Sequence, residues 1–370
     1  MKVGILTGGG DCPGLNAVIR AVSKALILQH GAEVVGFKDA FEGMVERRYT
    51  KLDYRDVSGI LTRGGTILGT SNKANPFEYH ARDGEDVSDE IVDLYRELEL
   101  DGVVAIGGDG TMSICHRLQE KGVNFVGVPK TIDNDVAHTD MTFGFDTAVS
   151  IATEAIDRLH TTGQSHNRVM ILETMGRYSG WIALHAGLAG GADVILLPEF
   201  PYELDEIERV CAQREDRQEF TIIAVAEGAR PVGGDMTVRE TDESSTDPVR
   251  LGGVGNVLKQ QLESRLNSEI RTTVLGHIQR GGTPTSFDRR LATNFGAYAA
   301  SLVARGSYGR MVALQDNHLT SVPLESVADT NRRVPEDSMY VASAAAVGTS
   351  FGRSDFDIEV ADLGDDVPLI

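Results

Sequence analysis

A chain of 370 residues, of which 41% are hydrophobic and 24% charged, can bury one large core or two ordinary ones, as a globular enzyme does. Its formal net charge of −20 argues against a nucleic-acid partner, which needs a basic surface. No apolar run approaches the roughly 20 residues of a membrane span, the first residues predict a strand rather than a signal peptide, and three widely spaced cysteines predict neither disulfides nor a zinc site, so we expect a cytoplasmic protein.

The acidic character comes with an unusual choice of basic residues. The chain has 35 lysines and arginines together, but only eight of these are lysines. An excess of Asp and Glu with little Lys suits a protein solvated in high salt, where self-repulsion is screened. An ordinary acidic cytoplasmic protein explains the composition equally well, and both interpretations stay open.

Short apolar runs alternate with helical patterns along the chain. Strands are predicted over residues 2–7, 32–37, 102–107, 125–129, 168–173, 193–199, 220–227 and 271–276, and helices over 16–28, 147–160, 205–214 and 288–304. Strands this apolar, separated by helices, predict an α/β fold of mainly parallel sheets covered on both faces. Such sheets bind ligands beyond the carboxyl ends of their strands. Residues 229–253 and the acidic segment 352–370 are predicted to be loops on the solvated surface.

The first glycine-rich segment, GGGDCPGLN, follows the first predicted strand. Gly8, Gly9 and Gly10 would let the backbone approach a ligand, and the N-terminus of the helix that follows favours an anion. The spacing is neither that of a Walker P-loop nor that of a Rossmann fingerprint. Taken alone, the segment is equally consistent with a plain turn between strand and helix.

A second segment, GGDGTMS, follows the strand predicted over residues 102–107 and is more specific. Gly107, Gly108 and Gly110 free the backbone, while Asp109 supplies a carboxylate and Thr111 a hydroxyl at a helix start. Phosphate held by backbone N–H groups, with Mg²⁺ on a carboxylate, is the logic of phosphoryl transfer. Thr111 could simply cap its helix, but a capping role does not explain the flanking glycines.

The segment VPKTIDND follows the next strand and places Asp133 and Asp135 two positions apart, with Lys130 just upstream. A hydroxyl that accepts a phosphoryl group must give up a proton, and either carboxylate could take it. Two neighbouring carboxylates repel unless a cation joins them, and Lys130 or Mg²⁺ would serve. An Asx-turn with a solvated lysine is the alternative interpretation of this segment alone.

Basic residues recur beside the later strands. Arg168 and Arg271 open two of them, and GHIQRGG contributes His277 and Arg280. The fork geometry of arginine suits a phosphate monoester. Glu227 ends an apolar strand, where it can accept hydrogen bonds from sugar hydroxyls.

Together these motifs resemble the phosphofructokinase family, whose members phosphorylate fructose 6-phosphate at its 1-hydroxyl. The resemblance covers roughly residues 1 to 350 and is carried, in order, by GILTGGGDCPGLNAVIRA, RGGTILGT, AIGGDGT, PKTIDND, TFGFDTA, AIDRL, SHNRV, MGRYSGWIAL, VAEG and TVLGHIQRGGTP. It implies two α/β domains with the active site in the cleft between them. The larger would comprise residues 1–144 plus 279–330, and the smaller residues 145–278 plus 331–370.

The resemblance also implies roles for individual residues. Asp133 would be the base, with Thr131, Asp135 and Arg177 as further catalytic residues, and Asp109 would hold Mg²⁺. The donor phosphates would be bound by Gly10, Gly108, Gly110, Thr111 and Lys130. The sugar phosphate would be bound by Thr131, Asp133, Arg168, Met175, Gly176, Arg177, Glu227, Arg271, His277 and Arg280. In the family, the residues matching Arg168 and Arg271 come from a neighbouring subunit, which implies a homodimer or homotetramer with shared active sites.

Two residues indicate different phosphoryl donors. In the family, glycine at the position of Gly110 accompanies ATP, whereas pyrophosphate users carry aspartate there. Lys130, however, resembles the pyrophosphate users, while the common bacterial ATP enzymes have glycine. Phe41 could stack on an adenine or could belong to the core. We therefore predict ATP as donor, with pyrophosphate as the alternative.

Other functions remain as alternatives. NAD kinases and diacylglycerol kinases share a GGDG-type loop but lack the pair TIDND and GHIQRGG. An inactive sugar-phosphate-binding paralogue is expected to lack Asp109 or Asp133, and both are present. An acceptor range that includes sedoheptulose 7-phosphate also stays open.

Overall fold

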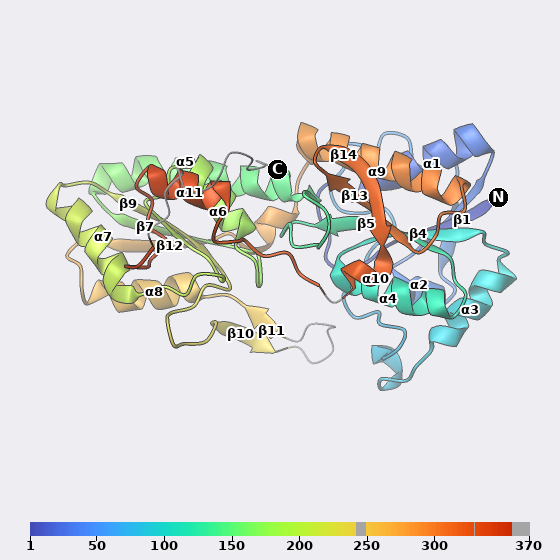
Figure 1. Cartoon of the computed structure of the whole chain (residues 1–370), viewed down its shortest axis with the longest axis horizontal. Helices are drawn as coiled ribbons and strands as arrows, with labels where there is room; N and C mark the ends of the chain where they lie inside the picture. Colours follow the sequence, from blue (N-terminus) through green and yellow to red (C-terminus); the bar gives the residue numbers. More distant parts are fainter. Residues whose placement is uncertain (242–248, 329, 357–370) are drawn as a thin grey trace.

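The computed structural model describes residues 1–241, 249–328 and 330–356, which form two lobes side by side (Figure 1). One lobe contains an eight-stranded sheet with the strand order β14-β13-β5-β4-β1-β2-β3, and β6 pairs with β5. Its strands are β1 (Lys2–Thr7), β2 (Glu33–Phe37), β3 (Tyr49–Leu52), β4 (Gly102–Gly107), β5 (Phe125–Thr131), β6 (Phe143–Gly144), β13 (Arg310–Gln315) and β14 (His318–Pro323). The outermost strands β3 and β14 run antiparallel to their neighbours, and the other pairings are parallel.

Helices cover both faces of this sheet because its central strands are apolar on both sides. Along β4, Val104 and Ile106 join the same core cluster as α1 (Leu15–His30) and α9 (Ser286–Ala304). Val103 and Ala105 face the other side, which is covered by α2 (Phe41–Val45), α3 (Ser88–Glu97), α4 (Asp109–Glu120) and α10 (Leu324–Val327) (Figure 1). This alternation with a period of two residues is what a fully buried parallel strand requires.

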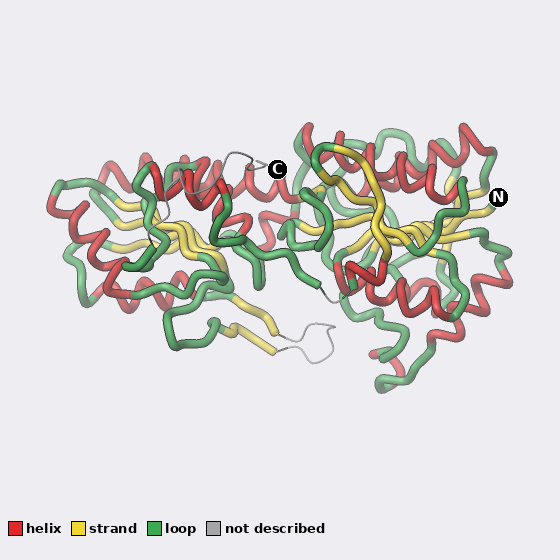
Figure 2. Tube along the Cα trace, viewed as in Figure 1, coloured by secondary structure: helices red, strands yellow, loops and turns green. Residues whose placement is uncertain are grey.

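The other lobe is built on a four-stranded parallel sheet in the order β12-β7-β9-β8. Helices lie on both sides of its strands (Figure 2). Its strands are β7 (Val169–Thr174), β8 (Val194–Leu196), β9 (Thr221–Ala226) and β12 (Ile270–Val274). The helices of this lobe are α5 (Phe145–His166), α6 (Trp181–Ala189), α7 (Leu204–Asp216), α8 (Val254–Glu263) and α11 (Met339–Ala346). A small antiparallel pair, β10 (Val238–Thr241) with β11 (Val249–Leu251), and two 3₁₀ turns, η1 (His80–Arg82) and η2 (Gly276–Arg280), complete the elements.

The predicted α/β class with mainly parallel sheets is confirmed, and each predicted strand and helix is present with ends shifted by a few residues. The loop predicted over residues 229–253 is wrong in part, because β10 and β11 lie there. Both strands are short and polar, so no apolar run in the sequence predicts them. Most of the predicted tail, residues 357–370, lies outside the described residues. In the described part, no helix combines the length and apolar character needed to cross a membrane.

A buried carboxylate joins the first turn of α5 to the first turn of α9. Asp288 is fully buried and accepts hydrogen bonds from the backbone N–H of Thr147 (2.8 Å) and from its hydroxyl (2.5 Å). Burial raises the pKa of Asp288 to about 6. Because α5 follows β6 directly, this contact also fixes β6, which pairs with Lys130 and Thr131 at the end of β5.

The contact between α1 and α9 depends on a glycine. A Cβ on Gly296 would lie 2.9 Å from the carbonyl oxygen of Val18 and 2.8 Å from the Cβ of Ala21. Gly→Ala in an open helix stabilises by about 1 kcal/mol. We expect Gly296→Ala to lower the free energy of unfolding by about 1–3 kcal/mol instead, because overpacking forces the two helices apart.

Chemical denaturation of Gly296→Ala beside Ala297→Ser, a change on the exposed face of the same helix, measures this difference. A Gly296→Ala protein as stable as the unaltered protein would contradict the tight packing.

Candidate active site

The glycine-rich loop after β1 packs against the carboxyl ends of β4 and β5. The N–H of Gly8 donates to the carbonyl of Ile106 at 2.8 Å, and the ammonium of Lys130 donates to the carbonyl of Gly10 at 2.5 Å. A Cβ on Gly8 would lie 2.7 Å from the hydroxyl oxygen of Thr111. The glycines are therefore needed for the close approach of the loop to the neighbouring strand ends.

Lys130 is an unusual lysine because its side chain is almost fully buried, with 4% exposed. Burial lowers its pKa, while the nearby Asp133 and Asp11 favour its charged form. The guanidinium of Arg280 opposes the charge of Lys130 and itself donates to the carbonyl of Asp11 at 3.2 Å. Two cations thus converge on the loop after β1, as the binding of an anion requires.

Three carboxylates lie near each other beyond β4 and β5. The pKa of Asp135 is raised to about 7, first by burial and then by the negative charges of Asp133 and Asp109. Asp133 is 5% exposed, and its Oδ1 is buried without a hydrogen-bond partner in the structure. Such an atom is ready to accept a proton or a hydrogen bond from a ligand.

The loop that carries Asp133 and Asp135 is held in shape by Asn134. Asn134 adopts a left-handed conformation (φ 53°), its Oδ1 accepts from the N–H of Thr142 at 2.9 Å, and its Nδ2 donates to the carbonyl of Asp140 at 3.3 Å. Thr131 accepts from the N–H of Asp133 at 3.0 Å. Asn134 was not predicted, although it lies inside the TIDND motif and asparagine tolerates the left-handed region better than most residues.

On the smaller lobe, the loop after β7 meets the ends of β9 and β12. The N–H of Arg177 (φ 50°) donates to Oε1 of Glu227 at 3.1 Å, and the N–H of Met175 donates to the side chain of Gln279 at 2.8 Å. The strained turn also needs Gly176, whose φ is 144°. Gln279 is fully buried and was not predicted, although it lies between His277 and Arg280 in GHIQRGG.

Charge interactions cross from one lobe to the other. The pKa of Glu227 is raised to about 7, first by burial and then by the negative charge of Asp133 on the opposite lobe, while hydrogen bonds from the backbone of Arg177 and Gly176 work against this shift. Arg280, which follows β12, reaches the backbone of Asp11 after β1. The predicted residues after β1, β4, β5, β7, β9 and β12 therefore lie near one another between the two sheets.

A second loop supports the glycines after β1. Thr70 donates to the carbonyl of Gly9 at 2.5 Å, the N–H of Gly9 donates to the carbonyl of Ser71 at 3.2 Å, and the hydroxyl of Thr7 donates to the carbonyl of Gly69 at 2.6 Å. These contacts were not predicted, because they join segments about 60 positions apart.

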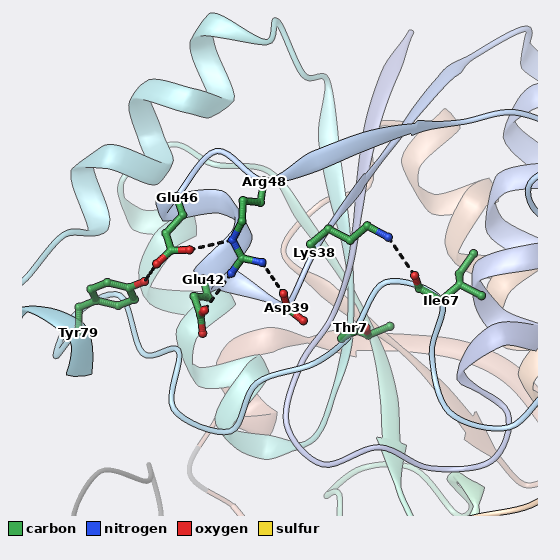
Figure 3. A network of polar contacts seen from close by, with 9 residues as sticks. Thr7, Lys38, Asp39, Glu42, Glu46, Arg48, Ile67 and Tyr79 are labelled. Atoms are coloured by element: carbon green, nitrogen blue, oxygen red, sulfur yellow. Dashed lines mark hydrogen bonds and ion pairs between the residues drawn. The ribbon is translucent and has the colours of Figure 1, made fainter.

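The loop over residues 66–71 is in turn fixed by a network centred on Arg48 (Figure 3). The guanidinium pairs with Asp39, with Glu42 at 2.8 Å and with Glu46 at 2.8 Å, and the hydroxyl of Tyr79 donates to Glu46 at 3.2 Å. These ion pairs raise the pKa of Arg48. They also hold the side chain of Asp39 against the backbone near Gly69, where a Cβ would lie 2.1 Å from Oδ1 of Asp39.

Arg168 and Arg271 lie elsewhere. Both form ion pairs with Glu269, and both lie near the amino ends of their parallel strands, whereas Glu227 follows a carboxyl end. At about 3.3 Å per residue, the amino ends and the carboxyl ends of these strands are separated by roughly 20 Å. Arg168 and Arg271 therefore lie away from the other predicted site residues of their own chain, whereas the exposed His277 follows the carboxyl end of β12, on the same side as Glu227.

Phe41 is not available to stack on a nucleotide. Its side chain is 2% exposed and packs edge-to-face against Phe125, with ring centroids 6.4 Å apart. The alternative that Phe41 is a core aromatic is therefore confirmed, and the adenine-stacking interpretation is wrong.

A separate cavity of about 340 Å³ lies between α7 and residues 345–356. Its wall includes Asp193, which precedes β8, so the cavity lies at the amino edge of the four-stranded sheet, away from the cleft. Two of the arginines that line it form ion pairs with acidic neighbours: Arg214 with Asp193 at 3.0 Å, and Arg353 with Glu336 at 3.0 Å.

Comparison of the sequence with known proteins finds one matching family and several similar proteins. The sequence pattern of the phosphofructokinase family matches residues 2–303. A protein of Clostridium perfringens named ATP-dependent 6-phosphofructokinase 2 is 51% identical over 358 residues, which is 95% of this chain and 98% of its own. A Streptomyces coelicolor protein named pyrophosphate–fructose 6-phosphate 1-phosphotransferase is 49% identical over 353 residues, which is 95% of this chain and 100% of its own.

Solved structures agree with the sequence comparison. The phosphofructokinase of Pichia pastoris in the T-state is 31% identical with a TM-score of 0.77, and the match covers 88% of this chain but only 37% of the yeast chain. A pyrophosphate-dependent phosphofructokinase from Marinobacter aquaeolei, at 20% identity and a TM-score of 0.76, shares the fold over 92% of this chain and 88% of its own.

The raised pKa of Glu227 makes stability depend on pH. The folded protein keeps this proton up to about pH 7, while an ordinary glutamate releases it near 4.5. Between these values the folded state binds more protons than the unfolded state, so the free energy of unfolding falls as pH rises. We expect Glu227→Gln to become more stable than the unaltered protein by about 1–3 kcal/mol on going from pH 5 to pH 8.

Calorimetric unfolding at pH 5, 6, 7 and 8 without added Mg²⁺ measures this gain. Glu120→Gln, which alters an exposed carboxylate on α4, is the matched control and is expected to follow the unaltered protein at every pH. A Glu227→Gln protein whose advantage does not change with pH would show that Glu227 is not held protonated.

Proposed function

The chain belongs to the phosphofructokinase family, and we propose that it transfers a phosphoryl group from ATP to the 1-hydroxyl of fructose 6-phosphate in the cytoplasm, a glycolytic step. The products are fructose 1,6-bisphosphate and ADP. The observation that carries the proposal is the position of Asp133. Its carboxylate is buried with an unpartnered oxygen, close to the cation Lys130 on the larger lobe and to Glu227 on the smaller.

Asp133 acts as the base. As the sugar oxygen forms its bond to the terminal phosphorus, the bond from phosphorus to the bridging oxygen of the donor breaks and the proton of the hydroxyl moves to Asp133. Thr131 fixes the backbone of Asp133, and Asp135 supports the same site from two positions further along. Catalysis is then mostly positioning and charge neutralisation in a site shielded from water.

The donor phosphates are held at the glycine loops. Gly108 and Gly110 leave room for phosphate oxygens, and Gly10 lets the guanidinium of Arg280 approach the loop, since a Cβ there would lie 2.8 Å from its Nη1. Thr111 offers a hydroxyl, and Lys130 supplies positive charge next to Gly10. A Cβ on Gly110 would meet no atom within 4 Å, so the space in front of this loop is open.

The neighbouring carboxylates of Asp109, Asp133 and Asp135 suit Mg²⁺, because burial first and then the negative charges of Asp133 and Asp109 raise the pKa of Asp135, so a cation beside these groups would be favoured. Mg²⁺ prefers one or two carboxylates together with donor phosphates and water. Asp109 would hold the ion, whose charge would neutralise the phosphate oxygens.

The sugar phosphate is bound from the smaller lobe. Thr131 and Asp133 face the loop over residues 175–177 and Glu227, which we assign to the sugar, while His277 and Arg280 bind its phosphate. Arg168 and Arg271 lie at the opposite edge of their sheet, so we propose that they complete the site of a second copy in a homodimer or homotetramer.

Pyrophosphate is the second candidate donor. Lys130 matches the pyrophosphate users of the family, and proteins named for either donor are about equally similar to this chain. We favour ATP because Gly110 leaves open the space that an inner phosphate of a nucleotide needs. An acceptor range that includes sedoheptulose 7-phosphate is compatible with the same site.

Replacing the base tests the reaction directly. Asp133→Asn keeps the size and the backbone contacts of the side chain but cannot take a proton. We expect kcat to fall about 10²–10⁴-fold, while the Kd for fructose 6-phosphate from calorimetric titration stays within threefold. Asp157→Asn, on the exposed face of α5, is the control, and an Asp133→Asn enzyme with a tenth or more of normal turnover would rule out the assigned role.

A charge placed at Gly110 tests the donor. The open space and ordinary backbone there allow Gly110→Asp to fold, and the carboxylate would repel the inner phosphates of ATP. We expect kcat/KM for ATP to fall at least about tenfold relative to that for pyrophosphate, whereas Gly110→Ala changes this ratio little. An unchanged ratio in Gly110→Asp would show that Gly110 does not select the donor.

A further inference from the structure

We propose that Arg332 is a positioning residue for the transfer, which braces the loop carrying Asp133 and Asp135 against Trp181 at the start of α6. The proposal rests on the proposed function, since its effect is the alignment of Asp133 with the sugar-binding loop. Arg332 belongs to the segment that leads from α10 on one lobe to α11 on the other, and no sequence motif singles it out.

One side of Arg332 holds the catalytic loop. Its backbone N–H donates to the carbonyl of Asp135 at 2.7 Å, and its Nη1 donates to the carbonyl of Asp140 at 2.7 Å. The neighbouring Asn331 forms an antiparallel bridge with Val136. The carbonyl of Asp140 thus receives two donors, Arg332 and the Asn134 that shapes the loop between the two aspartates.

The other side of Arg332 lies on the smaller lobe. Its guanidinium sits over the ring of Trp181, 4.4 Å from the centroid, and the indole N–H of Trp181 donates to the carbonyl of Arg332 at 3.4 Å. Trp181 is 4% exposed and opens α6, immediately after the loop that contains residues 175–177. A single side chain therefore joins the loop of the base to the loop assigned to the sugar.

The segment is fixed at a second point close by. Oε1 of Glu199 accepts from the N–H of Val334 at 2.9 Å and from the N–H of Gly180 at 3.0 Å. This carboxylate ties the segment after Arg332 to the residue just before Trp181. Trp181 and Glu199 therefore fix the position of Arg332 relative to the smaller lobe independently of each other. The hydrogen bond from Arg332 to Asp140 then positions the loop that carries Asp133 and Asp135.

Arginine suits this place for a geometric reason. A guanidinium can lie flat on an aromatic face while its edge donates in the plane, which the ammonium of lysine cannot do. Burial lowers the pKa of Arg332, and Asp140 opposes that shift, so the side chain bears a desolvated charge that the ring and the carbonyl stabilise together.

The test compares Arg332→Met and Arg332→Lys with Arg333→Met, which alters the exposed neighbour. Because small misplacements of a catalytic group are costly, we expect kcat to fall about 10–100-fold in both Arg332 variants. The KM for fructose 6-phosphate should rise at least threefold, while the KM for the donor stays within twofold. A general loss of folding would not separate the two substrates in this way, and Arg333→Met should behave as the unaltered enzyme.

A second measurement uses the fact that Trp181 is the only tryptophan in the sequence. Its emission should change when fructose 6-phosphate is titrated into the unaltered protein, and Arg332→Met should lose most of that change. Arg332 variants with kcat and both KM values within twofold of normal would overturn the proposal. Inactivity of the unaltered protein with both donors would instead overturn the proposed function, and the emission of Trp181 would then decide the role of Arg332 alone.

Discussion

The structure depends on how a group of buried and partly buried charges is balanced at the end of β5. Lys130, Asp133 and Asp135 follow one another within six positions, and Asp109 and Glu227 approach from two other strands. Burial shifts the pKa values of the cation and of the acids in opposite directions, down for Lys130 and up for Asp135 and Glu227, because it disfavours every charged form. Burying any one of these charged side chains alone would carry a large desolvation cost, so each depends on the opposite charges and hydrogen bonds of its neighbours.

The need to bring these charged side chains together explains how the loops of the two sheets are arranged. Parallel strands bring their carboxyl ends to one edge, so six loops from two sheets can contribute to the same cleft. The glycines after β1 and β4 make space that a Cβ would fill, and the left-handed residues Asn134 and Arg177 aim the loops on the two sides. Such strained positions persist because neighbouring contacts determine them, as Asn134 illustrates with its bonds to Thr142 and Asp140.

The sequence predicts the parts that are local and leaves open those that depend on distant contacts. Apolar runs locate the central strands because burial on both faces demands them, and the glycine and aspartate motifs locate the loops. The membership in the phosphofructokinase family predicted from those motifs is confirmed. The roles of Arg332 and Gln279 could not be predicted, because each acts on a segment more than 100 positions away. The sequence also left open whether Phe41 stacks on an adenine or belongs to the core. Its burial decides this, and that burial depends on tertiary packing that no motif encodes.

The residues between the two sheets are proposed to transfer the terminal phosphoryl group of ATP to fructose 6-phosphate. Phosphorus NMR of the unaltered protein with Mg²⁺ and fructose 6-phosphate, with ATP or pyrophosphate added separately at low and at molar KCl, tests it most directly. We expect fructose 1,6-bisphosphate and ADP with ATP, and much slower product formation with pyrophosphate. Product from pyrophosphate alone, or from neither donor at either salt concentration, would contradict it.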